Sequence, residues 1–342
     1  MKAHNKRIIV LSDGTWNDPE DDNATNVLRM ARAVKPVDSE GFKQVVFYDW
    51  GVGSYYQSAL GGGVGLGIQK NVQDGYRFIV QNYNPGDEVW LFGFSRGAYT
   101  ARCLAGFLNK CGILKRTQAN EIPAAFHFYK QRKTKPSDPA ASRWRRAHCH
   151  SSGRGTVDFL GVWDTVGALG VPTRVLAFVD EKDLFYDHDL GSNVQVARHA
   201  VAIDERRADF KPTLWTKKDA VDVKQVWFAG VHSDIGGGYA PDDGGHLLSD
   251  IPLAWMAREA SACGIEFERH LYSASALRVQ ADMHRSYRSF WRALGKETRV
   301  LPTDATLHQS VQQRFQRTDY RPKQLMEWLD VRNGKWGDLE AN

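Results

Sequence analysis

The sequence predicts an α/β fold in which a mainly parallel sheet is flanked by helices. Short runs of β-branched and aromatic residues alternate with longer segments of helical period, which is the pattern of repeated strand-helix-strand units. The composition is that of an ordinary globular protein, because 42% of the 342 residues are hydrophobic and 25% are charged. A chain of this size buries about three quarters of its surface on folding, so a large core is expected.

The alternation predicts five strands and five helices. Strands are expected at residues 7–12, 45–49, 88–92, 157–162 and 224–228. Helices are expected at residues 24–33, 69–82, 96–109, 193–201 and 250–263. The glycine-rich run of residues 61–67 matches neither G-x-x-x-x-G-K-[ST] nor G-x-G-x-x-G. We therefore expect a flexible turn there rather than a nucleotide site.

The pattern divides the chain into a core and two additions. We expect an α/β core over residues 1–265, with a basic insertion at about 115–155 and a C-terminal elaboration, residues 266–342, packed on the core. Between Lys130 and Arg154, eight basic residues stand against the single acid Asp138. This segment is either a solvated basic loop or a surface for peripheral contact with anionic membrane lipids.

Charge and cysteine content narrow the classes of partner and location. The net charge is +5, from 45 basic and 40 acidic residues, which is mild for a nucleic-acid-binding protein, so no nucleic acid is expected. Four cysteines without a C-x-x-C pair indicate neither a zinc ribbon nor a disulfide framework. The sequence shows no secretory leader pattern and no apolar stretch of about 18 residues. We expect a cytoplasmic protein in the producing cell, with any export using a route independent of a signal peptide.

Ser95 stands at the boundary between an expected strand and an expected helix. It is the centre of Gly93-Phe94-Ser95-Arg96-Gly97, a G-x-S-x-G motif directly after the apolar run of residues 89–92. In such a turn the serine backbone is strained, and small residues on both sides let neighbouring backbone pass. The hydroxyl then lies at the carboxyl end of the sheet above a helix N-terminus, which favours negative charge. This context predicts a nucleophilic serine on an α/β-hydrolase-like fold.

A nucleophilic serine needs a base to take its proton and a carboxylate to orient that base. Asp164 follows one strand, in Gly161-Val162-Trp163-Asp164, and His232 follows another, in Phe228-Ala229-Gly230-Val231-His232. The order Ser95, Asp164, His232 is the chain order of α/β-hydrolase triads. We predict that these three residues are the nucleophile, the acid and the base.

Three other residues compete for the acid and base roles. His308 is an alternative base, because the base of such folds often lies in a late loop. Asp204 and Asp234 are alternative acids, although an acid as close to His232 in sequence as Asp234 would also serve to hold the loop.

The loop after the first strand is a candidate oxyanion hole. Backbone N–H groups of Gly14 or Thr15, together with that of Arg96, would stabilise a tetrahedral intermediate. The alternative is a turn stabilised by the Asp13 side chain. An aspartate before Gly-Thr also occurs in phosphatases, but Leu11 occupies the position of their nucleophile, which argues against that chemistry.

No cofactor and no metal are expected. The sequence lacks H-E-x-x-H, and His148-Cys149-His150 is too closely spaced for a helix-borne ligand pair. The alternative is a hard cation such as calcium, held by the acidic residues of the first loop, Asp13, Asp18, Asp21 and Asp22.

Four segments together resemble one family: Leu11-Ser12-Asp13-Gly14-Thr15-Trp16-Asn17, Gly93-Phe94-Ser95-Arg96-Gly97-Ala98-Tyr99, Gly161-Val162-Trp163-Asp164-Thr165-Val166-Gly167 and Gly230-Val231-His232-Ser233-Asp234-Ile235-Gly236-Gly237-Gly238-Tyr239. The sequence is similar to an α/β-hydrolase domain that includes the first family of type VI secretion lipase effectors. The resemblance implies a phospholipase with Ser95 as nucleophile, Asp164 as acid and His232 as base. It also implies an immunity protein as partner if the chain is an effector. Secreted effectors of this family are usually longer and carry a membrane-contacting module. The expectation that we draw from the resemblance is therefore limited to ester hydrolysis.

Other functions remain open on the sequence alone. A carboxylesterase acting on a small or glycan ester would use the same three residues, and so would a serine peptidase or amidase. A non-catalytic protein that binds membranes or nucleic acids on a hydrolase scaffold is the alternative from another class.

Overall fold

A seven-stranded sheet with strand order β2-β1-β3-β4-β5-β6-β7 forms the centre of the molecule. The computed structural model describes residues 5–14, 22–51, 63–166, 190–216, 218–273, 278–287 and 295–341. Every pairing of neighbouring strands is parallel. The strands are β1 (Lys6–Ser12), β2 (Lys43–Asp49), β3 (Glu88–Phe94), β4 (Val157–Trp163), β5 (Val194–Ala202), β6 (Asp222–Phe228) and β7 (Thr306–Leu307).

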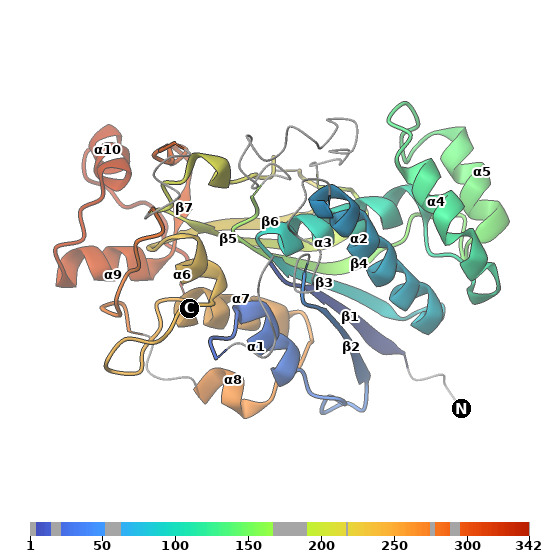
Figure 1. Cartoon of the computed structure of the whole chain (residues 1–342), viewed down its shortest axis with the longest axis horizontal. Coiled ribbons are helices and arrows are strands. Elements are labelled where there is room, and N and C mark those ends of the chain that lie inside the picture. The colour runs from blue at the N-terminus through green and yellow to red at the C-terminus, as the bar shows by residue number, and fades with distance from the viewer. Residues whose placement is uncertain are drawn as a thin grey trace.

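Helices cover both faces of the sheet, as Figure 1 shows. Those described are α1 (Asn26–Ala33), α2 (Gly63–Asn82), α3 (Arg96–Cys111), α4 (Ile122–Tyr129), α5 (Pro139–His148), α6 (His232–Gly236), α7 (Asp250–Ala262), α8 (Arg269–Ser273), α9 (Gln309–Arg317) and α10 (Lys323–Val331). Two 3-10 helices, η1 (Arg116–Glu121) and η4 (Ala208–Phe210), lie in connections. This is the predicted α/β-hydrolase-like class, a mainly parallel sheet flanked by helices.

The two faces of β1 show how the core is divided. Ile8 and Val10 belong to one hydrophobic cluster, with residues of α2 and α3. Ile9 and Leu11 belong to a second cluster, with residues of α1 and α7. Because side chains alternate along a strand and helices cover both faces, residues 8–11 of β1 are all buried and all apolar.

The five expected strands are confirmed, with ends shifted by at most two residues. The helix expected at residues 193–201 is wrong, since this segment is strand β5, paired with β4 and β6. A central parallel strand that is buried on both faces shows no polar alternation, so its sequence pattern is not distinguished from that of a buried helix. The turn expected at residues 61–67 is wrong from Gly63 onward, where α2 begins; residues 61 and 62 lie outside the described residues.

The basic insertion consists of helices η1, α4 and α5 between α3 and β4. It packs on α3 through Phe107, whose ring lies 5.5 Å from that of Phe126 and 5.2 Å from that of Tyr129. The solvated loop expected between Lys130 and Arg154 is therefore replaced in part by helix α5. Figure 1 places α4 and α5 at one end of the molecule and α9 and α10 at the other.

The C-terminal elaboration adds an edge strand to the sheet. Leu307 of β7 lies opposite Trp227 of β6, and α9 and α10 contribute Val311 and Trp328 to a third hydrophobic cluster that includes Trp227. The placement of a domain boundary at residue 265 remains a prediction. Among the described residues, no helix is both long and apolar enough to cross a membrane.

Candidate active site

Ser95 lies in a strained turn between β3 and α3. Its backbone angles are φ 58° and ψ −121°, a conformation that a residue with a side chain rarely adopts. The flanking glycines are required by close packing. A Cβ at Gly93 would lie 2.4 Å from the Gly97 carbonyl oxygen, and a Cβ at Gly97 would lie 2.0 Å from the Ser12 carbonyl oxygen. The turn therefore holds Ser95 at the carboxyl edge of the sheet, next to the point where the strand order reverses between β1 and β3.

His232 is the first residue of α6, in the connection that follows β6. Its Nε2 lies 2.8 Å from the Ser95 Oγ. The imidazole is held between two aromatic rings, those of Phe94 and Phe210, with centroid distances of 4.7 and 4.9 Å. Its own rotamer is thus restricted by packing as well as by hydrogen bonds.

Asp164 completes a chain of hydrogen bonds that begins at Ser95. The residue directly follows β4, has φ 38°, and is fully buried. Its Oδ2 lies 2.6 Å from the Nδ1 of His232, and its Oδ1 accepts the N–H of Ala202 at 2.9 Å. An ionised carboxylate only accepts hydrogen bonds, so the proton of a neutral imidazole belongs on Nδ1 and the lone pair of Nε2 faces the serine hydroxyl.

Arg299 binds both carboxylate oxygens of Asp164, an interaction that the sequence did not predict. Its guanidinium donates to Oδ1 at 2.6 Å and to Oδ2 at 2.9 Å. It also donates to the backbone carbonyls of Ala202 and Phe210, at 2.7 Å each. Arg299 lies in an irregular segment before β7, where no motif or periodicity singles it out. Only the folded chain brings it beneath Asp164.

The surroundings of Asp164 and His232 lower the pKa values of both groups. Burial by itself would raise the pKa of Asp164, but the charge of Arg299 and the hydrogen bonds from His232 and Arg299 hold it well below its ordinary value. Burial lowers the pKa of His232 below 6.5, and the hydrogen bond and charge of Asp164 oppose that shift only in part. At neutral pH the pair is therefore a carboxylate beside an unprotonated imidazole.

Glu205 is a second buried acid near His232 that the sequence did not predict. Its Oε2 accepts the backbone N–H of His232 at 3.2 Å. Arg207 donates to both of its oxygens at 2.9 Å, and Ser286 Oγ donates to Oε1 at the same distance. Although burial would raise it, these interactions with Arg207 lower the pKa of Glu205 to about 2. Glu205 thus anchors the backbone of α6 at its first residue.

The three competing residues are engaged elsewhere. His308 is the N-cap of α9, where its Nδ1 lies 2.8 Å from the Ser310 Oγ. Asp234 of α6 accepts the N–H of the N-cap residue Val231 at 3.0 Å, so it holds its own loop. Asp204 accepts the N–H of Gly230 at 2.8 Å. The structure therefore places Ser95 against His232 rather than against His308.

The expected oxyanion-hole donors are not all brought together. The Gly14 N–H donates to the Asp13 Oδ1 at 2.7 Å, and Asp13 Oδ2 accepts from Tyr48 Oη at 2.9 Å and from Thr25 Oγ1. The loop is thus the turn stabilised by Asp13, in which the Gly14 N–H is already engaged. Thr15 lies outside the described residues. Arg96 is the first residue of α3, immediately after Ser95.

The described part of the chain offers no ready set of ligands for a metal ion. It contains no group of three or more His, Cys, Asp or Glu side chains that could hold one. Of the acidic residues considered for a hard cation, Asp18 and Asp21 lie outside the described residues, and Asp13 is engaged by Thr25 and Tyr48.

Comparison with known proteins assigns the family. The model of the catalytic domain of Tle1-like phospholipase effectors of the type VI secretion system matches residues 6–259. The chain belongs to this family. The matched range holds Ser95, Asp164 and His232, whereas Arg299 and β7 lie beyond it. Arg299, which binds Asp164, therefore comes from the segment after residue 259, outside the matched range.

Individual relatives of this Tle1-like chain are distant. An uncharacterized protein of Saccharomyces cerevisiae is 25% identical over 234 residues, covering 62% of this chain and 33% of that protein. A crystal structure of an uncharacterized protein from Pseudomonas aeruginosa aligns with 78% of this chain and 47% of its own, at 18% identity and TM-score 0.48. The Tle1 effector bound to the VgrG spike aligns with 69% and 52%, at 20% identity and TM-score 0.43. The chain thus spans between a third and about half of the length of these proteins.

Proposed function

We propose that this protein is a serine hydrolase with phospholipase activity, which cleaves acyl ester bonds of glycerophospholipids through an acyl-enzyme. The observation that carries the proposal is the hydrogen-bonded chain from Ser95 through His232 to Asp164, with distances of 2.8 and 2.6 Å. Membership in a phospholipase effector family supports the choice of a phospholipid among esters.

In the first half of the reaction, Ser95 Oγ attacks the ester carbonyl while His232 Nε2 takes the hydroxyl proton. Asp164 stabilises the imidazolium that forms. The negative charge that develops on the carbonyl oxygen lies near the N-terminus of α3, where the N–H of Arg96 and the helix dipole favour an anion. Collapse of the intermediate breaks the bond to the lysophospholipid alcohol, which leaves with the proton held on His232.

In the second half, water replaces the alcohol. His232 Nε2 takes a proton from the water as its oxygen attacks the acyl carbon, and then returns a proton to Ser95 Oγ as that bond breaks. The products are a fatty acid and a lysophospholipid, and the enzyme returns to its starting state. No redox step or cofactor enters this sequence.

Arg299 and Glu205 support the proposed triad without touching the reacting atoms. Arg299 fixes the orientation of the Asp164 carboxylate through a two-point contact, and Glu205 fixes the backbone of His232. A carboxylate held in this way keeps the imidazole in the tautomer that accepts the serine proton.

Release of fatty acid from phospholipid vesicles tests the proposal. The wild-type protein should release fatty acid, and Ser95→Ala should lose at least about a thousandfold in rate. Ser142→Ala is the matched control, because Ser142 lies on α5 in the basic insertion and should leave activity unchanged. Short p-nitrophenyl esters and aryl amides, measured in parallel, separate the alternatives. Turnover of short esters alone would keep the triad and exclude the lipid substrate, and turnover of amides alone would indicate a peptidase or amidase.

A labelled fluorophosphonate tests the nucleophile independently of substrate choice. Such a reagent phosphonylates an activated serine with loss of fluoride, so the wild-type protein should be labelled and Ser95→Ala should not. Absence of labelling in the wild type, together with salt-dependent binding to anionic vesicles, would support the non-catalytic alternative.

Membership in an effector family makes delivery to another cell part of the proposal. Expression directed to the periplasm of a bacterial host should cause lysis with the wild-type protein and none with Ser95→Ala. A neighbouring gene product that suppresses the lysis would be the expected immunity partner. Equal lysis by both proteins would exclude phospholipid hydrolysis as its cause.

A further inference from the structure

A cavity of about 590 Å³ opens beside the proposed active site. Val231, on its wall, directly precedes His232 and is the N-cap of α6. Ser286, also on its wall, donates to Glu205, which in turn accepts the His232 N–H. The cavity therefore shares its wall with the groups that hold His232, on the side of the C-terminal elaboration.

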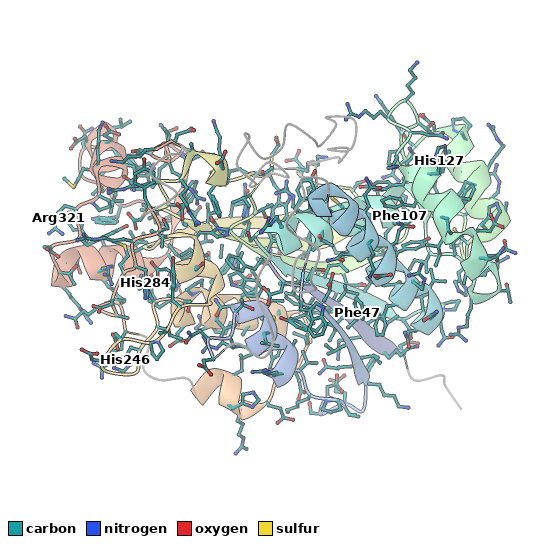
Figure 2. The ribbon with its side chains drawn as sticks, viewed as in Figure 1. Phe47, Phe107, His127, His246, His284 and Arg321 are labelled. Atoms are coloured by element: carbon teal, nitrogen blue, oxygen red, sulfur yellow. The ribbon has the colours of Figure 1, made fainter. Side chains whose placement is uncertain are left out.

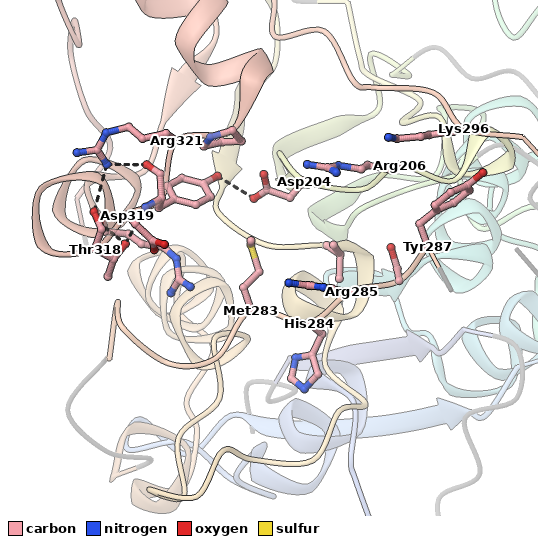
Figure 3. A pocket seen from close by; sticks show the side chains of 15 residues that line it. Asp204, Arg206, Met283, His284, Arg285, Tyr287, Lys296, Thr318, Asp319 and Arg321 are labelled. Carbon is pink, nitrogen blue, oxygen red and sulfur yellow. Dashed lines mark hydrogen bonds between the residues drawn. The ribbon is translucent and has the colours of Figure 1, made fainter. Parts of the chain in front are cut away.

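The wall of this cavity is strongly basic. It carries five Arg and Lys side chains against two Asp, namely Arg206, Arg285, Lys296, Arg314, Arg321, Asp204 and Asp319. Figure 3 shows Arg206, Lys296 and Tyr287 on one side of the cavity, with Asp319 and Arg321 on the opposite side. We call Arg206, Arg285 and Lys296 the cationic trio.

Two of the five cations are committed to the fold. Arg314 donates to the carbonyls of Val279 and Ala281, at 2.5 and 2.8 Å. Arg321 donates to the carbonyl of Phe315 in α9 at 2.6 Å and to that of Tyr320 at 2.8 Å. Their guanidinium groups are thus held by neutral acceptors, and their charges remain on the wall of the cavity.

The cationic trio, in contrast, is exposed and has no carboxylate within ion-pair distance in the described part of the chain. Arg207 and Arg299 behave differently, since Arg207 pairs with Glu205 and Arg299 pairs with Asp164. Asp204, the acid on the wall whose charge interacts with that of Arg206, is engaged by the Gly230 N–H and by Tyr320 Oη. The cavity therefore presents three cations that form no ion pair with a carboxylate among the described residues.

The chemistry of the wall selects a compact oxyanion. Guanidinium groups bind phosphate through paired N–H donors, and an ammonium adds a point charge. Ser286 and Tyr287 also line this wall, and the Ser286 hydroxyl donates its hydrogen to Glu205. Apolar side chains are few, with Val231, Met283 and Pro322 as the main ones, so the cavity suits a polar headgroup and not an acyl chain.

We propose that the cationic trio forms a phosphate-binding subsite, which holds the phosphate of a glycerophospholipid headgroup while its acyl ester reaches Ser95. This inference rests on the proposed function and adds to it a basis for selecting phospholipids over neutral glycerides. The subsite lies at the opposite end of the molecule from the basic insertion. In Figure 2, His284 and Arg321, which line the cavity, are far from His127 of α4.

The test compares two triple variants of the full chain. The first, Arg206→Gln with Arg285→Gln and Lys296→Gln, removes the trio. The control, Lys133→Gln with Lys135→Gln and Arg143→Gln, removes the same charge from exposed positions of the basic insertion. Substrates are a phosphatidylglycerol and a diacylglycerol with identical acyl chains, each diluted in nonionic detergent micelles so that surface charge is small.

We expect the trio variant to lose at least tenfold in kcat/KM on the phospholipid and to change less than twofold on the diacylglycerol. The control variant should change less than twofold on both. An equal loss for both variants on the phospholipid would overturn the subsite in favour of general charge attraction. An equal loss on both substrates, or no loss on either, would overturn it as well.

Calorimetric titration with glycerol 3-phosphate and with inorganic phosphate separates the subsite from the proposed function. Both anions should bind the wild type and Ser95→Ala, and neither should bind the trio variant. Tighter binding of glycerol 3-phosphate would identify a headgroup as the ligand, whereas equal binding would identify free phosphate and overturn the headgroup assignment. Binding of these anions without hydrolysis of any ester would support the subsite and refute the proposed hydrolase. Ester hydrolysis without anion binding would support the hydrolase and refute the subsite.

Discussion

Arg299 binds both carboxylate oxygens of Asp164 although 135 residues separate them in sequence. The contact is fully buried, and the same guanidinium donates to two backbone carbonyls. A buried carboxylate is stable as an anion only when it is paired and hydrogen-bonded, so Arg299 makes the ionised state of Asp164 compatible with the core.

Replacing Arg299 should therefore damage both stability and chemistry. We expect Arg299→Met to lose about 3–5 kcal/mol of unfolding free energy, because it leaves an unpaired buried charge. The kcat/KM should fall about a hundredfold through misplacement of His232. Removing the cation also leaves the Asp164 charge unopposed, which should raise the pKa of His232 and move the acidic limb of the pH profile upward.

Arg145→Met is a matched control for this prediction. Arg145 is also buried and donates to the carbonyls of Lys110, Pro136 and Ser152, far from the triad. It should lower stability without moving the pH profile. If both variants leave the acidic limb unchanged, Arg299 has a structural role alone. Arg299→Lys, which restores the charge but not the two-point contact, should recover part of the activity.

Substitution of the two competing histidines should separate their roles. We expect His232→Gln to lose at least about a thousandfold in kcat/KM, because no other base contacts Ser95 Oγ in the described structure. His308→Asn should remain within a few-fold of the wild type, since asparagine also serves as an N-cap for α9. Steady-state hydrolysis of p-nitrophenyl esters measures both. A large loss in His308→Asn with an intact fold by circular dichroism would contradict the assignment.

The pH dependence should follow His232. Only its unprotonated form accepts the serine proton, so kcat/KM should fall as the pH drops through the pKa of His232. Since burial lowers that pKa, the acidic limb should lie below pH 6.5, and activity at pH 6.5 should exceed half of its plateau. A profile on a soluble ester, restricted to pH values where the fold is intact, checks this. A midpoint of the acidic limb above pH 7 would contradict this explanation.

The turn at Ser95 should not tolerate a side chain at Gly97. A Cβ there would meet the Ser12 carbonyl oxygen at 2.0 Å, and backbone cannot move aside as a flexible side chain does. We expect Gly97→Ala to lose about 3 kcal/mol of unfolding free energy. Gly153→Ala is the control, because its Cβ would meet only the Ser151 Oγ, at 3.3 Å. Urea unfolding of both variants gives the comparison, and similar midpoints would show that the turn relaxes.

The strands and the positions of Ser95, Asp164 and His232 could be predicted because their signals are local. An apolar run followed by a glycine-flanked polar residue marks the end of a parallel strand, and the ends of such strands meet at one edge of a sheet. The sequence thus indicated which side chains would be neighbours before their geometry was known. The failure at β5 has a local cause as well, since a strand buried on both faces lacks the alternation that distinguishes it from a helix.

By itself, then, the sequence determined the fold class and the family motifs, and it predicted Ser95, Asp164 and His232 while leaving His308, Asp204 and Asp234 as alternatives. Tertiary structure decided that His232 and not His308 faces Ser95, that Arg299 binds Asp164 and Glu205 binds the His232 backbone, that Asp13 engages the Gly14 N–H, and that the cationic trio gathers around one cavity. These relationships join residues up to 137 positions apart, as between Ser95 and His232. Arg299, Glu205 and the trio stand outside the motifs and have no periodicity around them, so only the packed chain places their charges.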